Sequence, residues 1–288
     1  MSTGYYHENS DNINLKVQFP LNEIYCGNCL DILPLLDTSS VDMILCDIPY
    51  GTTACPWDVV LPLPAMWYEF TRVIKPARTI ALFGSEPFSS HLRTSNITQF
   101  KYDWVWEKGR ASGYMHAKNK PLKVHEIISI FSSGTTVHAT QSANRMQYFP
   151  QFTAGKPYRR VHKKINSGKL NHMPSASNDN FVGTVLENTG RRYPRSVLHF
   201  SQHNVGTIHP TQKPVDLCEY LIRTYTSENE IVLDACAGSG TTGIACMRSN
   251  RQFILIEIDE EYCLAARQRL DAEAVTLGSE TSVPEIQA

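Results

Sequence analysis

The chain has 288 residues, of which 42% are hydrophobic and 19% charged, and its formal net charge is −1. This length allows one large domain, or one domain with a substantial insertion, and the composition excludes global disorder. No apolar run approaches the roughly eighteen residues of a membrane span. The polar N-terminal segment lacks the apolar core of a secretion signal, so we expect a cytoplasmic protein.

Residues 1–20 are predicted to form a flexible arm, after which strand-like and helix-like segments alternate. Residues 64–75 place apolar side chains at helical intervals and stop at Pro76. Short apolar runs, in contrast, are typical of buried strands. In this half of the chain the predicted strands are residues 41–47, 79–85, 102–108 and 126–133.

Residues 135–198 have a different character, because they are rich in Asn, Ser, Gly and basic residues and show little periodicity. Between Arg145 and Arg195, ten Lys and Arg residues face two acids, a local balance of +8, so the rest of the chain sums to −9. One basic face on an acidic body favours a polyanionic partner. The alternative is a solvated loop that is merely basic.

Regular alternation returns after this insertion. The predicted elements are a helix at 214–226, a strand at 230–236, a turn and helix at 238–250, a strand at 252–259, a helix at 260–274 and a flexible tail at 275–288. Repeated β–α alternation predicts an α/β fold, Rossmann-like and doubly wound, with a mostly parallel sheet covered on both faces.

A glycine turn follows the strand that ends at Asp234. Gly238 and Gly240 allow the backbone to turn tightly and approach a ligand, and Glu257 ends the next strand, where a Rossmann-like fold binds ribose hydroxyls. The turn reads G-S-G-T-T without G-x-G-x-x-G or G-K-[ST], which disfavours a dinucleotide and a P-loop. Asp234 would repel a pyrophosphate and suits an ammonium group. This combination favours S-adenosylmethionine.

Eight cysteines raise the question of a metal site. Cys26 and Cys29 form a CxxC, but no second CxxC follows, and half of a zinc motif is weak support. We therefore expect no metal and, in the cytoplasm, reduced thiols.

The tetrapeptide Asp47-Ile48-Pro49-Tyr50 ends the first apolar run, and "HPTQKP" (209–214) precedes the glycine turn. With these motifs in this order, the chain resembles the S-adenosylmethionine-dependent DNA amino-methyltransferases of the permuted β subgroup, whose catalytic motif is usually D-P-P-Y. The resemblance spans residues 24–274. It implies a seven-stranded sheet with a catalytic part at 21–134, a loop-rich target-recognition insertion at 135–198 and a cofactor-binding part at 199–274.

The resemblance also implies roles for individual residues. Asp47 and the carbonyl of Ile48 would accept the N–H groups of the target amine, Pro49 would stiffen the turn, and Tyr50 would stack on a flipped base. Ile48 departs from the family's usual proline, which costs the turn some rigidity. Lys213 would meet the cofactor's carboxylate. The expected cofactor-binding residues are Asn28, Thr211, Lys213, Asp234, Cys236, Gly238, Ser239, Gly240, Thr241, Thr242 and Glu257.

The expected partner is double-stranded DNA, whose phosphates the basic insertion would neutralise. The expected DNA-binding residues are Arg145, Arg159, Arg160, Lys163, Lys164, Arg191 and Arg192. The family also implies a homodimer, although no sequence feature locates an interface.

The resemblance predicts a site-specific DNA methyltransferase of a restriction–modification system or an orphan methylase. An acid at position 47, where cytosine-directed relatives usually carry serine, favours adenine N6. The alternatives are cytosine N4 and, from another class, a non-catalytic DNA-binding protein that kept the fold. A further alternative is an enzyme that methylates a glutamine amide in protein or a base in RNA. Such enzymes are typified by an N-P-P-Y motif that follows the glycine turn, whereas in this chain the catalytic motif comes first.

Overall fold

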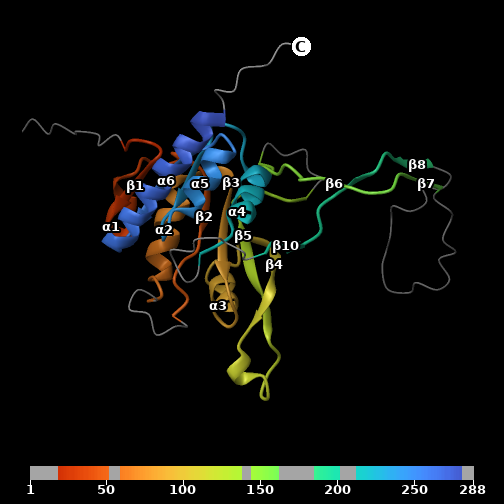
Figure 1. Cartoon of the computed structure of the whole chain (residues 1–288), viewed down its shortest axis with the longest axis horizontal. Helices are drawn as coiled ribbons and strands as arrows, with labels where there is room; N and C mark the ends of the chain where they lie inside the picture. Colours follow the sequence, from red (N-terminus) through yellow and green to blue (C-terminus); the bar gives the residue numbers. More distant parts are fainter. Residues whose placement is uncertain (1–18, 52–58, 138–143, 162–184, 202–211, 281–288) are drawn as a thin grey trace, which may run out of the picture.

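A central sheet of eight strands organises the computed structural model, which describes residues 19–51, 59–137, 144–161, 185–201 and 212–280. Its strands are β1 (Glu23–Cys26), β2 (Val41–Cys46), β3 (Ile74–Gly84), β4 (Phe100–Ser112), β5 (Lys123–Phe131), β10 (Val197–His199), β11 (Ile231–Asp234) and β12 (Gln252–Glu257). They lie in the order β1-β12-β11-β2-β3-β5-β4-β10 (Figure 1).

The sheet is mostly parallel, because only β5 runs against its neighbours β3 and β4. The predicted Rossmann-like, doubly wound α/β fold is therefore confirmed, with one strand more than the seven expected. The eighth strand, β10, pairs with the edge strand β4 and comes from the end of the predicted insertion.

Helices cover both faces of the sheet. One face carries α1 (Cys29–Ile32), α2 (Leu63–Val73) and α3 (Phe88–Ser95), and the other carries α4 (Val215–Tyr225), α5 (Thr241–Arg248) and α6 (Glu260–Glu280). Side chains of a strand alternate between the faces. In β2, Met43 and Leu45 pack on the α4–α6 side, while Ile44 and Cys46 pack on the α1–α3 side. This double burial explains why the strand reads as a continuous apolar run.

Some element boundaries differ from the sequence predictions. Helix α2 ends at Val73, and Ile74 is already extended, with φ −75° and ψ 139°. Pro76 disfavours a helical conformation at the residue before it, so the chain enters β3 early. Helix α6 continues to Glu280, six residues beyond its predicted end at residue 274.

The insertion contains two small antiparallel ribbons that extend away from the sheet (Figure 1). In one, β6 (Thr153–Ala154) pairs with β9 (Arg191–Arg192), and in the other, β7 (Tyr158–Val161) pairs with β8 (Val185–Asn188). Residues 1–18, 162–184 and 281–288, which hold most of the predicted arm, part of the insertion and the end of the tail, lie outside the described residues.

Two cysteines do not follow the sequence prediction. A disulfide joins Cys26 to Cys263, with their Cα atoms 6.0 Å apart, so the expectation of reduced thiols is wrong for this pair. The two residues are 237 positions apart and meet because α6 packs against β1, which no spacing rule could indicate. Among the described residues, no group of three or more His, Cys, Asp or Glu is arranged to hold a metal. None of the helices described is long and apolar enough to cross a membrane.

Candidate active site

A cavity of about 590 Å³ lies at the carboxyl ends of β2 and β11. These strands are neighbours, with Leu233 opposite Ile44. From β2 the chain crosses to β3 on one side, and from β11 it crosses to β12 on the other. Ligands of doubly wound folds bind at such a switch point. The cavity is lined by both predicted groups, the Asp47–Tyr50 turn and the segment from Asp234 to Thr242 without Gly240.

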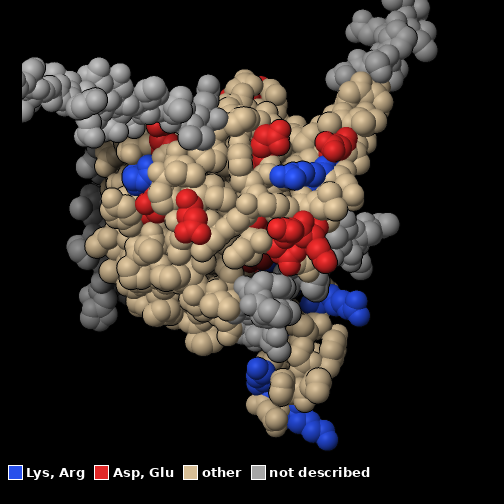
Figure 2. Space-filling view, turned by 90° about the vertical axis from the view of Figure 1, so that its left-hand side faces the viewer, with Lys and Arg blue, Asp and Glu red and all other residues tan. Residues whose placement is uncertain are grey.

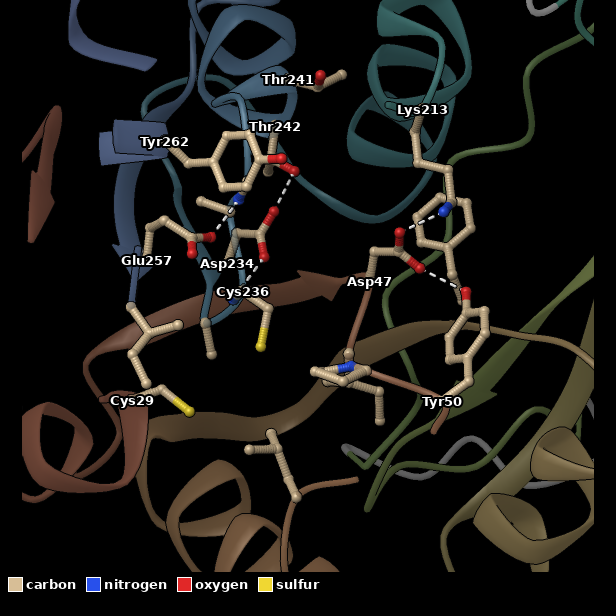
Figure 3. A pocket seen from close by; sticks show the side chains of 18 of the residues that line it. Cys29, Asp47, Tyr50, Lys213, Asp234, Cys236, Thr241, Thr242, Glu257 and Tyr262 are labelled. Carbon is tan, nitrogen blue, oxygen red and sulfur yellow. Dashed lines mark hydrogen bonds and ion pairs between the residues drawn. The ribbon is translucent and has the colours of Figure 1, made fainter. Parts of the chain in front are cut away.

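Asp47 and Tyr50 face each other across the first strand-end turn (Figure 3). The Tyr50 hydroxyl donates a hydrogen bond to Asp47 Oδ1, and the ring stacks on Phe88 with centroids 5.2 Å apart and planes at 26°. Burial and the charge of Asp47 raise the pKa of Tyr50 well above its usual value, so its hydroxyl remains a donor. Ile48, in place of the family's proline, is 1% exposed and packs in the core on the α1–α3 side.

Lys213 also contacts Asp47, which the sequence did not predict. Its Nζ forms an ion pair with Asp47 Oδ2, lies 3.5 Å from Glu126 Oε2 and sits over the Phe83 ring (Figure 3). Burial alone lowers the pKa of Lys213, but the two carboxylates outweigh it and raise the pKa to about 12. Lys213 is therefore a buried, permanent cation that fixes the orientation of the Asp47 carboxylate.

Glu126, which also lines the cavity, and Lys108 extend this charge network. Lys108 pairs with Glu126 Oε1 and lies 5.3 Å from the centroid of the Trp106 ring. Burial raises the pKa of Glu126, but the Lys213 and Lys108 ammonium groups outweigh it and lower the pKa. Glu126 thus stays ionised and balances Lys213. Neither Glu126 nor Lys108 belongs to a spacing pattern that could have revealed the network.

Asp234 lies at the other end of the cavity and is 4% exposed. Its Oδ1 accepts a hydrogen bond of 3.1 Å from the Cys236 backbone N–H, and its Oδ2 accepts one of 2.6 Å from the Thr242 hydroxyl. Burial raises the pKa of Asp234 to about 6, against these two hydrogen bonds. A nearby cation would stabilise its ionised form.

Glu257 holds the glycine turn in place. Its Oε2 accepts a hydrogen bond of 2.6 Å from the Gly238 N–H, and its Oε1 accepts one of 3.0 Å from the Asp259 N–H. Gly238 and Gly240 have φ values of 51° and 77°, which favour glycine. A carboxylate can accept further bonds. Glu257 can therefore both fix the turn and receive ligand hydroxyls.

The remaining predicted cofactor residues have mixed surroundings. Asn28 lines the cavity and caps α1 by accepting a 3.0 Å hydrogen bond from the Leu30 N–H. Ser239 donates a 3.1 Å hydrogen bond to Gln212 Oε1. Cys236 forms a hydrogen bond with Cys29 that lowers the pKa of the Cys29 thiol, a contact the sequence did not indicate. Ser239, Thr241 and Thr242 line the cavity, whereas Thr211 lies outside the described residues.

The predicted DNA-binding residues lie in the insertion, apart from this cavity. Arg159 pairs with Glu187 at 3.3 Å, and both side chains are exposed. The Arg191 guanidinium lies 3.9 Å from the centroid of the Phe152 ring. Arg192 lies over the Tyr158 ring and donates to Asn188 Oδ1 and to the Lys156 carbonyl. It therefore stabilises the ribbons. Arg145 and Arg160 are exposed, and Lys163 and Lys164 lie outside the described residues.

Comparison with known proteins identifies the family. The family described as DNA methylase, of the N6/N4 type, matches residues 41–268, which include both ends of the cavity. The chain belongs to the N6/N4 DNA methylase family. Its sequence is 28% identical to the type II methyltransferase M.HpaI of Haemophilus parainfluenzae over 267 residues, covering 87% of this chain and 74% of that protein.

Two solved structures have a similar fold. The structure of the M1.HpyAVI–SAM complex aligns with a TM-score of 0.56 and 21% identity, covering 86% of this chain and 98% of that one. The cytosine-N4-specific PvuII DNA methyltransferase also has a TM-score of 0.56, with 15% identity and coverage of 88% and 91%. At these identities the likeness concerns the fold.

Asp234→Asn tests whether this end of the cavity binds the cofactor. The pKa of Asp234 is raised from 3.8 to about 6, so its contribution to stability falls as the pH rises through this window. Asn cannot ionise, so we expect the melting temperature at about pH 7.5 to equal or exceed that of the wild type. Loss of a charged partner should weaken S-adenosylmethionine binding at least about tenfold, measured by calorimetry. A strongly lowered melting temperature with unchanged affinity would contradict this assignment.

Lys213→Met distinguishes two roles for this lysine. If Lys213 positions Asp47, the turnover number for methyl transfer falls at least about tenfold, while the dissociation constant of S-adenosylmethionine changes little. If Lys213 instead binds the cofactor's carboxylate, the affinity for S-adenosylmethionine falls more than the turnover number. Because the buried Glu126 and the half-buried Asp47 lose their cation, the free energy of unfolding should fall by about 3 kcal/mol, measured by denaturant titration. Lys213→Arg, which keeps the charge, is the matched control.

Proposed function

We propose that this protein transfers a methyl group from S-adenosylmethionine to adenine N6 within a specific sequence of duplex DNA. The observation that carries the proposal is the single cavity that contains both Asp47, with its aromatic neighbour Tyr50, and the Asp234–Glu257 pair. One end offers acceptors for an amine, and the other offers carboxylates for a nucleoside that carries an amino acid.

The donor set of the cavity fits S-adenosylmethionine. The Glu257 carboxylate can accept hydrogen bonds from ribose hydroxyls in addition to the one from Gly238. Asp234 suits the ammonium group because a cation favours the ionised form of Asp234. The side chains of Leu30, Ile258 and Tyr262 also line the cavity and provide surface for the adenine ring. When bound, the cofactor supplies an electrophilic methyl group on a positively charged sulfur.

Asp47 prepares the target amine for attack. The lone pair of an exocyclic amine is delocalised into the ring, so the amine is a poor nucleophile. Asp47 and the Ile48 carbonyl accept its two N–H groups, which localises the lone pair toward the methyl group. Tyr50 donates to Asp47 Oδ1 and Lys213 pairs with Oδ2, so each oxygen uses one lone pair. The remaining lone pairs of the carboxylate can accept from the amine. The charge of Asp47 then stabilises the cationic nitrogen that forms.

The target atom lies inside the duplex, so the base must leave the stack and enter the cavity. Tyr50 lines this cavity, where its ring would stack on the base, and its contacts include Phe88 and Asp47. The basic residues of the insertion hold the phosphates and make binding salt-dependent. These are Arg145, Arg159, Arg160, Lys163, Lys164, Arg191 and Arg192.

The modified nucleoside decides between adenine and cytosine. We expect N6-methyladenine when DNA from a methylation-deficient host is incubated with the protein and S-adenosylmethionine, then digested and analysed by mass spectrometry. Detection of N4-methylcytosine would show that the target is cytosine, with the proposed mechanism unchanged. Cofactor binding without a methylated product on any DNA would instead support a non-catalytic DNA-binding protein.

Asp47→Ala and Tyr50→Ala separate chemistry from cofactor binding. Removal of a group that stabilises developing charge costs about 10²- to 10³-fold in turnover, so we expect Asp47→Ala to reduce methyl transfer at least this much. The dissociation constant of S-adenosylmethionine should remain close to wild type for both variants. Asp271→Ala, which removes an exposed carboxylate on α6, is the control. Loss of cofactor binding by Tyr50→Ala, with the fold intact, would show that the two ends of the cavity are misassigned.

A further inference from the structure

The β4–β5 hairpin extends past the sheet edge that holds the cavity (Figure 1). Strand β4 runs in the same direction as β2 and β11, so its final residues leave the sheet at this edge. From residue 109 to residue 125 every residue is exposed except 111 and 123, which are half-buried. The hairpin therefore contributes little to the core of the protein.

The hairpin carries only positive charge. From Lys108 to His125 the sequence has five Lys and Arg residues and no Asp or Glu. Lys108 pairs with Glu126, and Lys123 donates a hydrogen bond to Ser85, a neighbour that also lines the cavity. In the described part of the chain, no carboxylate forms an ion pair with the other three, which are Arg110, Lys118 and Lys120. Figure 2 shows Lys and Arg side chains on this projection at the lower end of the molecule.

Large apolar side chains occupy the tip of this basic hairpin. Gly113 turns the chain with φ 88°, and the short helix η2 (Tyr114–His116) follows. Tyr114 is 62% exposed and Met115 is 95% exposed, the highest value for any large hydrophobic side chain described. Exposing a methionine this fully contributes nothing to folding. An apolar tip surrounded by cations matches a duplex, which has phosphates outside and stacked bases inside.

We propose that the β4–β5 hairpin is a second DNA-binding arm, distinct from the insertion, and that Met115 and Tyr114 enter the base stack where the target base leaves it. Arg110, Lys118 and Lys120 hold the flanking phosphates. Lys123 connects the base of the hairpin to the cavity, so the arm starts beside the pocket that receives the flipped base. This inference rests on the proposed function, because the tip fills a gap that only base flipping creates.

Rescue by an unpaired target tests the tip. The recognition sequence is first located by sequencing methylated DNA, and duplexes that contain it are then used as substrates. Because the tip offsets the cost of unstacking, Met115→Ala should lower kcat/KM on a paired duplex by roughly tenfold or more. A duplex whose target base faces an abasic site should restore the rate to near wild type. Val275→Ala, which alters an exposed side chain on α6, should behave as wild type.

Salt dependence tests the binding of the flanking phosphates. We expect the Arg110→Ala, Lys118→Ala and Lys120→Ala triple variant to bind duplex DNA more weakly, measured by fluorescence anisotropy. The slope of log affinity against log salt concentration should decrease by roughly one for each phosphate that the variant no longer neutralises. Circular dichroism and S-adenosylmethionine affinity should match the wild type, since these residues lie outside the core and the cavity.

The outcomes separate this inference from the proposed function. If wild type methylates DNA and Met115→Ala does so equally well on paired duplex, the tip does not enter the stack. If the triple variant keeps wild-type affinity and salt slope, the hairpin is not a DNA-binding arm. If wild type binds DNA and methylates none, the proposed function fails, while the triple variant still decides whether the hairpin binds DNA.

Discussion

The ion pair between Lys213 and Asp47 is the interaction on which the site depends. The two residues are 166 positions apart, and each belongs to a different half of the chain. Lys213 is 7% exposed and the Asp47 side chain 26%, so water screens the pair less than on an open surface, and Glu126 and Lys108 complete a network of two cations and two carboxylates. The same contact that orients the Asp47 carboxylate therefore also joins the turn after β2 to the segment that precedes α4.

The sheet provides the second constraint. Because β2 and β11 are parallel neighbours, their carboxyl ends must meet, whatever the order of the two strands in the chain. The turn after β2 brings Asp47, and the turn after β11 brings Asp234, while β4 continues beyond the same edge as the basic hairpin. In the proposed function, DNA, the target base and the cofactor therefore all bind at this one edge of the sheet.

Much of this arrangement is readable from local sequence. Buried strands read as short apolar runs, and the residues that end them, Asp47, Asp234 and Glu257, line one cavity as strand-end residues should. The Lys213–Asp47 pair, the Glu126 network and the Cys26–Cys263 disulfide could not be predicted, because each joins residues that meet only through packing. Asn28 lines the cavity as its position in the sequence indicates, whereas its capping of α1 depends on a backbone turn that the sequence does not specify.

A crystal structure with S-adenosylhomocysteine, the stable product, would show where the cofactor binds. We predict that the ribose contacts Glu257, the ammonium group lies at Asp234 and the sulfur faces the Asp47 carboxylate across the same cavity. A product molecule bound elsewhere, or one whose sulfur points away from Asp47 and Tyr50, would contradict this prediction.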